Sequence, residues 1–184
     1  MPGYFIGLAL AIGVLAVLGI LAYFSKARRS LLRLRIDLDK TGAGVDALLK
    51  HRHDELPKLL GTCRGYMPHD HPAFGAIAQA RADYLKARTL QEKALANIAM
   101  ADAVKGLFKI AGDYPGLKSN NSFTKLRKQN ADLESNIDEQ QEFYNQLVKT
   151  YNRRIRRFPD SLAARRARLE AREPMAHAAV DDQA

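Results

Sequence analysis

The sequence predicts an all-α fold in which an N-terminal transmembrane helix is followed by a bundle of three long antiparallel helices and a short C-terminal helix. Three observations lead to this fold class. Twenty-one consecutive uncharged, mostly apolar residues run from Tyr4 to Phe24. Beyond them, apolar residues recur at steps of three and four over long stretches, which is the period of an α-helix. No alternating pattern of the kind that predicts a β-strand competes with that period.

The first element is the predicted membrane anchor, residues 1–25. A helix rises about 1.5 Å per residue, so the run from Tyr4 to Phe24 would span about 31 Å, close to the thickness of the hydrocarbon core of a bilayer. A cleaved signal peptide is the alternative, but it would have a basic start and a shorter apolar stretch. Because basic residues accumulate on the cytoplasmic side of a span, we expect a single-pass protein with its N-terminus outside and the rest of the chain in the cytoplasm. The basic residues that follow at once are Lys26, Arg28, Arg29, Arg33 and Arg35.

The basic juxtamembrane helix, residues 26–40, is expected to continue into the first helix of the bundle. Its apolar stripe runs from Leu31 to Tyr66 and keeps its phase across Gly42, Gly44 and Pro57. Glycine costs about 1 kcal/mol and proline about 3 kcal/mol inside a helix, so local propensity favours a break. The preserved phase favours one helix that bends near Pro57. We predict the continuous helix.

Two further long helices are predicted, and turns separate them. Residues 67–72 (MPHDHP) form a loop, and a helix rich in strong helix formers follows over about residues 73–112. Residues 113–121 (DYPGLKSNN) are turn-forming throughout. The third helix has the cleanest period of the chain, from Phe123 to Phe158, and Pro159 ends it.

The C-terminal region is predicted to hold a short basic helix over about residues 162–173, which completes a bundle domain of residues 41–173, and a disordered tail over residues 174–184. Long helices joined by short loops pack most simply as antiparallel neighbours. The first helix would then leave the membrane, the second would return and the third would leave again. This arrangement places residues 113–121 near the bilayer and the arginine-rich segment far from it.

The chain is basic, with 29 Lys and Arg against 20 Asp and Glu and a net charge of +9. Much of the excess lies in the juxtamembrane residues and in a distal segment from Arg153 to Arg172. Four interpretations stay open: a solvated helix face, acidic protein partners, anionic lipid headgroups and nucleic acid. Nucleic acid is disfavoured because no aromatic platform or known recognition motif accompanies the arginines. Anionic headgroups would gain about 1 kcal/mol per basic residue beside the membrane.

Two groups of histidines are the candidate metal ligands. His51 and His53 lie two residues apart on a helix, so their imidazoles point in different directions and cannot chelate together. His69, Asp70 and His71 lie in a loop, where an extended backbone could bring two imidazoles and a carboxylate together. Because further ligands are missing from the pattern, the alternative is a solvated loop that caps the neighbouring helix ends. We predict no metal ion and no cofactor.

Arg52 and Asp54 flank a helix seam. A buried arginine needs a carboxylate or carbonyl partner to offset the loss of its hydration. We therefore expect Arg52 to reach an acidic residue of a neighbouring helix, with a ligand or partner surface as the alternative.

A Tyr-Asn pair occurs twice on the third predicted helix, as Tyr144-Asn145 and Tyr151-Asn152. The separation of seven residues places both pairs on one stripe of the helix. Their polar groups are expected to bond to one another or to the backbone, with a small-molecule pocket as the alternative.

Signatures of catalysis are missing. The sequence holds no glycine-rich phosphate loop, nucleophile elbow or convincing acid pair, since Asp37 and Asp39 are two residues apart and close to the predicted membrane. Cys63, the only cysteine, falls on an apolar stripe and is expected in the core rather than as a nucleophile. We predict a non-enzymatic protein without catalytic residues.

Two stretches of the chain carry a family pattern. In residues 45–74 the matching elements are Arg52-x-Asp54-x-Leu56-Pro57, Leu60 and Gly65-Tyr66. In residues 114–164 they are Tyr114-Pro115-x-Leu117-Lys118, Asn121, Phe123, Glu134-x-x-Ile137, Tyr144-Asn145, Tyr151-Asn152 and Phe158-Pro159. In this order, behind an N-terminal apolar run, these elements cover most of the chain, which resembles the LemA family of bacterial membrane proteins.

The resemblance implies a single-span protein of the bacterial inner membrane with a short N-terminus outside and a cytoplasmic helical bundle. The family has no established molecular function, although some members belong to the machinery that shapes magnetosome membranes. This chain departs from the family pattern at Asp70, where a Glu is usual, and at residues 140–142 (QQE), near which an Arg is often found. The resemblance supplies no catalytic residues.

From these observations we expect a scaffold or adaptor for cytoplasmic or membrane partners, which could assemble as a homo-oligomer. The long helices, the single span and the lack of catalytic groups favour this function. The alternative is a membrane-surface organiser that binds anionic lipid through its basic segments.

Overall fold

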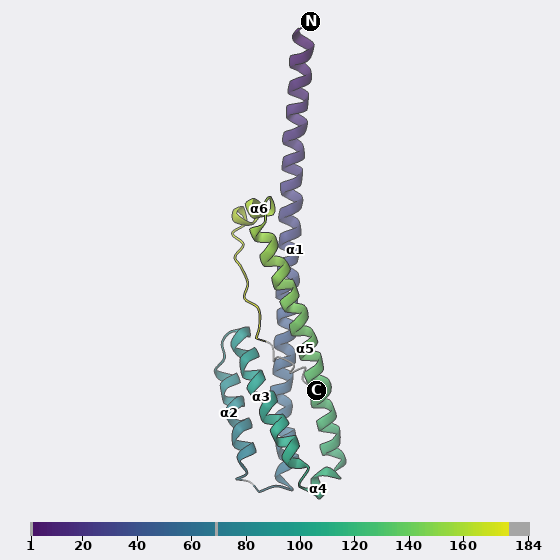
Figure 1. Cartoon of the computed structure of the whole chain (residues 1–184), viewed down its shortest axis with the longest axis vertical. Coiled ribbons are helices and arrows are strands. Elements are labelled where there is room, and N and C mark those ends of the chain that lie inside the picture. Colours follow the sequence, from purple (N-terminus) through teal and green to yellow (C-terminus); the bar gives the residue numbers. More distant parts are fainter. Residues whose placement is uncertain (1, 69, 177–184) are drawn as a thin grey trace, which may run out of the picture. The chain divides into compact units, whose positions relative to one another are not determined.

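The computed structural model describes the backbone of residues 2–68 and 70–176 (Figure 1). Side chains are described in the same ranges except at residues 2–12, 16 and 20. The regular elements of these ranges are helices: α1 (Pro2–Arg64), α2 (Pro72–Lys86), α3 (Leu90–Ala111), α4 (Pro115–Lys118), α5 (Asn121–Arg156) and α6 (Asp160–Arg166). The predicted all-α fold is therefore confirmed for the described residues.

α1 is one continuous helix of 63 residues that passes through Gly42 and Pro57, as predicted. Gly42 has a packing reason, because a Cβ atom there would lie 3.3 Å from Leu90 Cδ2 and 3.4 Å from Tyr144 Cε2. The glycine thus lets α3 and α5 approach α1 more closely than a larger residue would allow. Buried apolar side chains on both sides of Pro57 offset the local cost of the proline.

The predicted membrane span, Tyr4 to Phe24, belongs to the N-terminal part of α1. Its side chains at residues 4–12, 16 and 20 lie outside the described residues. Among the residues that are described, no helix combines the length and the apolar character needed to cross a membrane. The span therefore stays a prediction from the sequence.

The single helix predicted over residues 73–112 is wrong, because the chain forms a hairpin of two helices there, α2 and α3 (Figure 1). α2 ends at Lys86, and Ala87 has an extended backbone with φ −63° and ψ 128°. Thr89, which is also extended, precedes the first residue of α3. A connection this short is typical of two antiparallel helices.

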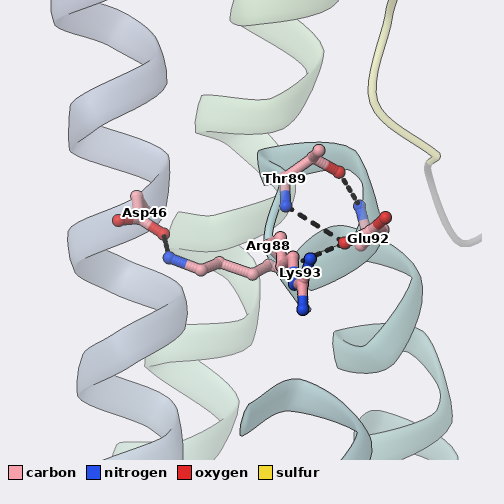
Figure 2. A network of polar contacts seen from close by, with 5 residues as sticks. All are labelled: Asp46, Arg88, Thr89, Glu92 and Lys93. Carbon is pink, nitrogen blue, oxygen red and sulfur yellow. Dashed lines mark hydrogen bonds and ion pairs between the residues drawn. The ribbon is translucent and has the colours of Figure 1, made fainter. Parts of the chain in front are cut away.

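Figure 2 shows how the start of α3 is fixed. The Thr89 hydroxyl accepts a hydrogen bond from the Glu92 N–H (3.1 Å), and the Glu92 carboxylate accepts from the N–H groups of Thr89 (3.1 Å) and Arg88 (2.6 Å). This capping box pairs backbone donors that have no partner inside the helix. Lys93 Nζ lies 2.6 Å from Asp46 Oδ1 and ties α3 to α1.

The capping box makes part of the stability depend on pH. Backbone hydrogen bonds from Arg88 and Thr89 lower the pKa of Glu92. Because the folded pKa is lowered, this stabilisation is present above the pKa of glutamate in the unfolded chain, about 4.3, and is lost as the pH falls through the folded value. We expect Glu92→Gln to remove that pH-dependent loss in urea unfolding followed by circular dichroism. The exposed Glu139→Gln is the matched control, and an identical pH profile for both variants would contradict the prediction.

The chain divides into two compact units. The first unit consists of residues 1–39 and 147–172, which are the N-terminal part of α1, the end of α5 and α6. The second unit consists of residues 40–146 and the residues from 173 onward. It therefore contains α2, α3 and α4 together with the remaining parts of α1 and α5.

The second unit is built on buried apolar side chains from four helices. They are Val45, Leu49 and Leu56 of α1, Ile77 of α2, Val104 and Leu107 of α3, and Ile137 of α5. Asn120 Nδ2, just before α5, donates to the Tyr66 hydroxyl (2.9 Å), and Gly116 lies against the Tyr66 ring. α5 therefore starts beside the C-terminal end of α1, whereas a single helix over residues 73–112 would have brought the chain back toward the start of the bundle before α5.

The first unit brings the arginine-rich end of the chain onto the residues that follow the predicted span. Ala163 and Ala164 of α6 pack against Ala27 and Leu31 of α1, with partly buried neighbours Phe24, Ile155 and Leu169. The predicted separation of the arginine-rich segment from the juxtamembrane residues is therefore wrong. The prediction failed because it had one helix where the chain forms two. The hairpin of α2 and α3 returns the chain to the C-terminal end of α1, so α5 runs in the opposite direction to the predicted one.

α6 ends at Arg166, so the basic helix predicted over residues 162–173 is shorter than expected. Arg168 has a positive φ of 50°, and residues 169–176 follow without helical structure. Within the predicted tail, Met175 is buried. Residues 177–184 of that tail lie outside the described residues.

Candidate functional site

The net charge of the chain is concentrated in the first unit. That unit holds 14 Lys and Arg against four Asp and Glu, a formal charge of +10. The second unit holds 15 Lys and Arg against 16 Asp and Glu, a formal charge of −1. The first unit, named the basic unit from here on, therefore carries the whole excess.

Most basic side chains of the basic unit are exposed. Internal ion pairs use few of them: Arg154 lies 3.0 Å from Asp160, and Asp39 lies 2.9 Å from Arg172 and 4.0 Å from Arg35. The rest of the positive charge faces solvent, where it attracts anions. The exposed residues include Lys26, Arg28, Arg29, Arg33 and Arg35 of α1, Arg153, Arg156 and Arg157 around the end of α5, and Arg165 and Arg166 of α6.

Polar contacts fix the start of α6 against α1 and α5. Arg154 donates to Ser30 Oγ (2.9 Å) and, through Nε, to Asp160 Oδ2 (3.0 Å). The Tyr23 hydroxyl lies 3.5 Å from Asp160 Oδ1. The first residue of α6 is therefore level with Tyr23, at the end of the predicted span.

The second unit has a groove of about 670 Å³ between α1 and α5. Polar side chains, including His51 and Asp132, line it beside five leucines. The polar lining carries both signs of charge, so the groove suits an amphipathic surface better than a strongly charged ligand. The leucines are Leu48, Leu56, Leu59, Leu126 and Leu133.

Arg52 lines this groove and is only 1% exposed. Its Nη1 donates to Asn97 Oδ1 of α3 (3.3 Å), and its Nη2 lies 3.7 Å from Glu134 Oε2 of α5. The predicted ion pair with a neighbouring helix is confirmed, whereas no sequence signal indicated Asn97. Burial lowers the pKa of Arg52, and the charges of Glu134 and Asp138 oppose that shift. Its Nε has no hydrogen-bond partner among the described residues.

His53, the other buried polar residue of this part of α1, has a structural role. Its ring stacks on Tyr84 of α2 with the ring centroids 4.8 Å apart. Its Nε2 lies 3.4 Å from Arg81 Nε, and its Nδ1 lies 3.3 Å from Asp54 Oδ1. Burial, followed by the charges of Asp46 and Asp54, raises the pKa of Tyr84. The arrangement joins α1 to α2.

The histidine loop caps a helix, as one of the two interpretations predicted. His71 Nδ1 accepts a hydrogen bond from a backbone N–H at the start of α2 (3.2 Å). Asp70 is exposed, and His69 lies outside the described residues. Across residues 2–68 and 70–176, no group of three His, Cys, Asp or Glu side chains is arranged to hold a metal ion.

The two asparagines of the Tyr-Asn repeat hold the C-terminal segment by its backbone. In the second unit, Asn145 accepts from the Met175 N–H (2.8 Å) and donates to the Met175 carbonyl (3.1 Å). In the basic unit, Asn152 accepts from the Arg172 N–H (2.9 Å) and donates to the Arg172 carbonyl (2.7 Å). The predicted bonding of the asparagines to the backbone is confirmed, and Arg172 and Met175 of the non-helical residues 169–176 supply the backbone groups.

Cys63 is fully buried in the second unit, as predicted for a core residue. Burial raises the pKa of its thiol to about 11, so little thiolate exists at neutral pH. We expect thiol-specific reagents to label the folded chain very slowly and to label it rapidly in urea. Gly61→Cys in a Cys63→Ala background places a thiol at an exposed site of the same helix and should react without urea. Equal labelling rates for both folded proteins would contradict the prediction.

The comparisons with known proteins agree with the pattern of motifs in the sequence. No curated protein matches the chain. The model of the LemA family matches residues 41–184, which is most of the chain and includes every matching element named above. The chain therefore belongs to the LemA family.

Proposed function

We propose that this protein is anchored in the membrane by a single span and that its basic unit binds anionic lipid headgroups, so that it organises the membrane surface beside its anchor. One observation carries the proposal: α6 packs against residues 24–31 of α1, directly behind the predicted span. Two basic segments that are far apart in the sequence thus form one unit of charge +10. Each basic residue near an anionic surface gains about 1 kcal/mol.

The sequence supports the anchor and its orientation. The run from Tyr4 to Phe24 carries no charged residue, and Lys26 follows two residues later. Basic residues on the C-terminal side of a span favour a cytoplasmic location for the rest of the chain. Electrostatic attraction to headgroups decays over about 8 Å at physiological salt, so basic residues beside the span gain most.

Photolabelling in vesicles tests this function. The full chain is reconstituted with an anionic or a zwitterionic phospholipid that carries a photoreactive headgroup. We expect peptides of the basic unit to be labelled by the anionic lipid, and we expect salt to reduce the labelling. Equal labelling by both lipids would overturn headgroup binding. Extraction of the chain from the vesicles by an alkaline carbonate wash would overturn the proposed membrane anchor.

A scaffold or adaptor function is the second candidate, and the groove of the second unit favours it. The leucines of α1 and α5 leave an apolar strip between polar side chains, which suits the apolar face of a partner helix. A photoreactive amino acid at Gln129, which lines the groove, should cross-link a partner in native membranes. The exposed Thr124 lies outside the groove lining and is the control position. The same cross-links from both positions, or none, would count against the scaffold.

A further inference from the structure

The corner between α5 and α6 exposes two large apolar side chains among arginines. Phe158 is 74% exposed and Leu162 is 46% exposed. The sequence period assigned Phe158 to the apolar stripe of the third helix, but α5 ends at Arg156 and leaves the ring outside that stripe. Two large apolar side chains exposed four residues apart at one corner of the chain are a candidate for an interaction surface. Two exposed arginines precede the corner and two follow it: Arg156, Arg157, Arg165 and Arg166.

We infer that this corner is a second membrane contact, in which Phe158 and Leu162 enter the interfacial layer of the bilayer while the flanking arginines bind anionic headgroups. The inference rests on the proposed single-span anchor, because the corner is held to α1. The proposed function involves only electrostatic binding of headgroups, and the inference adds a site at which apolar side chains insert into the bilayer.

The height of the corner along α1 supports the inference. Asp160, midway between the two apolar residues, has its Oδ1 3.5 Å from the Tyr23 hydroxyl. Tyr23 is the penultimate residue of the predicted span, and tyrosine is enriched where a span meets the headgroups. The corner therefore lies at the level of α1 where the hydrocarbon layer is expected to end.

The composition of the corner fits a lipid surface better than a protein surface. Interfacial segments combine Phe and Leu on one side with Lys and Arg on the other. Arginine can lay its apolar stem along the hydrocarbon boundary and keep its guanidinium among the phosphates. A protein partner would need an acidic rim around an apolar pocket, and it would have to reach that pocket beside the bilayer. An anionic membrane supplies both the negative charge and the apolar environment at the end of the predicted span, where the corner lies.

Tryptophan fluorescence tests the contact directly, because the chain contains no tryptophan. We expect Phe158→Trp in full-length protein, reconstituted in anionic vesicles, to emit at shorter wavelength and to be quenched by phospholipids brominated on their acyl chains. Phe143→Trp is the matched control, since Phe143 is a 50% exposed phenylalanine of α5 in the second unit. Its emission should be that of a solvated indole, quenched by aqueous iodide.

Leu162→Trp gives an independent reading if the first variant folds poorly. Solvent-like emission from both corner variants, with the same iodide quenching as Phe143→Trp, would overturn the inference. Solvent-like emission overturns the corner contact alone if the chain also resists carbonate extraction and the anionic lipid labels the basic unit. If carbonate releases the chain, the anchor and the corner contact fail together.

Discussion

Replacing Arg52 by alanine is expected to lower the free energy of unfolding by about 3 kcal/mol. The substitution leaves Asn97 Oδ1 without its donor and Glu134 without one of its cations, and it opens a cavity where α1, α3 and α5 meet. Glu134 keeps its ion pair with Lys105 (3.1 Å), which places the loss at the lower end of the range for a broken buried pair. Urea unfolding of the full chain in detergent, followed by circular dichroism, measures the change.

Arg52→Met separates the charge of Arg52 from its volume. Methionine fills much of the same space but leaves Asn97 and Glu134 without Arg52, so we expect it to recover only the cavity part of the loss, about 1 kcal/mol. If Arg52→Met destabilises the chain as much as Arg52→Ala, the polar contacts rather than the filled volume join the helices. A loss below about 1 kcal/mol in Arg52→Ala would contradict the role of Arg52 as a joint between three helices.

Elements with a long, regular period could be predicted from the sequence. The stripes of α1 and α5 kept their phase over many turns, and burial of those stripes outweighed the helix-breaking tendency of Gly42 and Pro57. The hairpin was missed because helix formers lie on both sides of residues 87–89 and because its local signature, Thr89-x-x-Glu92, is only four residues long. Periodicity reports burial of a face, and it does not report where the chain turns.

For contacts between distant segments, the sequence predicted the type of interaction but not the partner residue. Burial of Arg52 required an acidic partner on a neighbouring helix, but the period alone could not select Glu134 among the acidic residues available. Asn97 lies in the interior of α3 and had no signal in the sequence.

The packing of the two basic segments into one unit could not be predicted because the predicted chain topology was different. With one helix in place of α2 and α3, the predicted direction of α5 is reversed, and its arginines end far from residues 26–35. The short connection between α2 and α3, which was not predicted from the sequence, therefore accounts for the wrong direction predicted for α5.

The largest effect on lipid binding is expected when four exposed arginines of the basic unit are removed together. Substitution of Arg156, Arg157, Arg165 and Arg166 by glutamine lowers the formal charge of the unit from +10 to +6. At about 1 kcal/mol per basic residue near an anionic surface, the variant loses up to about 4 kcal/mol, or about a thousandfold in affinity. Native mass spectrometry of the full chain in neutral detergent, titrated with anionic or zwitterionic phospholipid, measures both affinities.

A second variant separates local binding from attraction by net charge. Glutamine at four exposed lysines of the second unit, Lys50, Lys109, Lys118 and Lys128, changes the net charge by the same amount. If the headgroups bind where the charge is concentrated, this variant keeps the preference for anionic lipid that the arginine variant loses. Equal losses would mean that the lipid responds to the total charge of the chain, and the packing of α6 against α1 would then have no part in lipid binding.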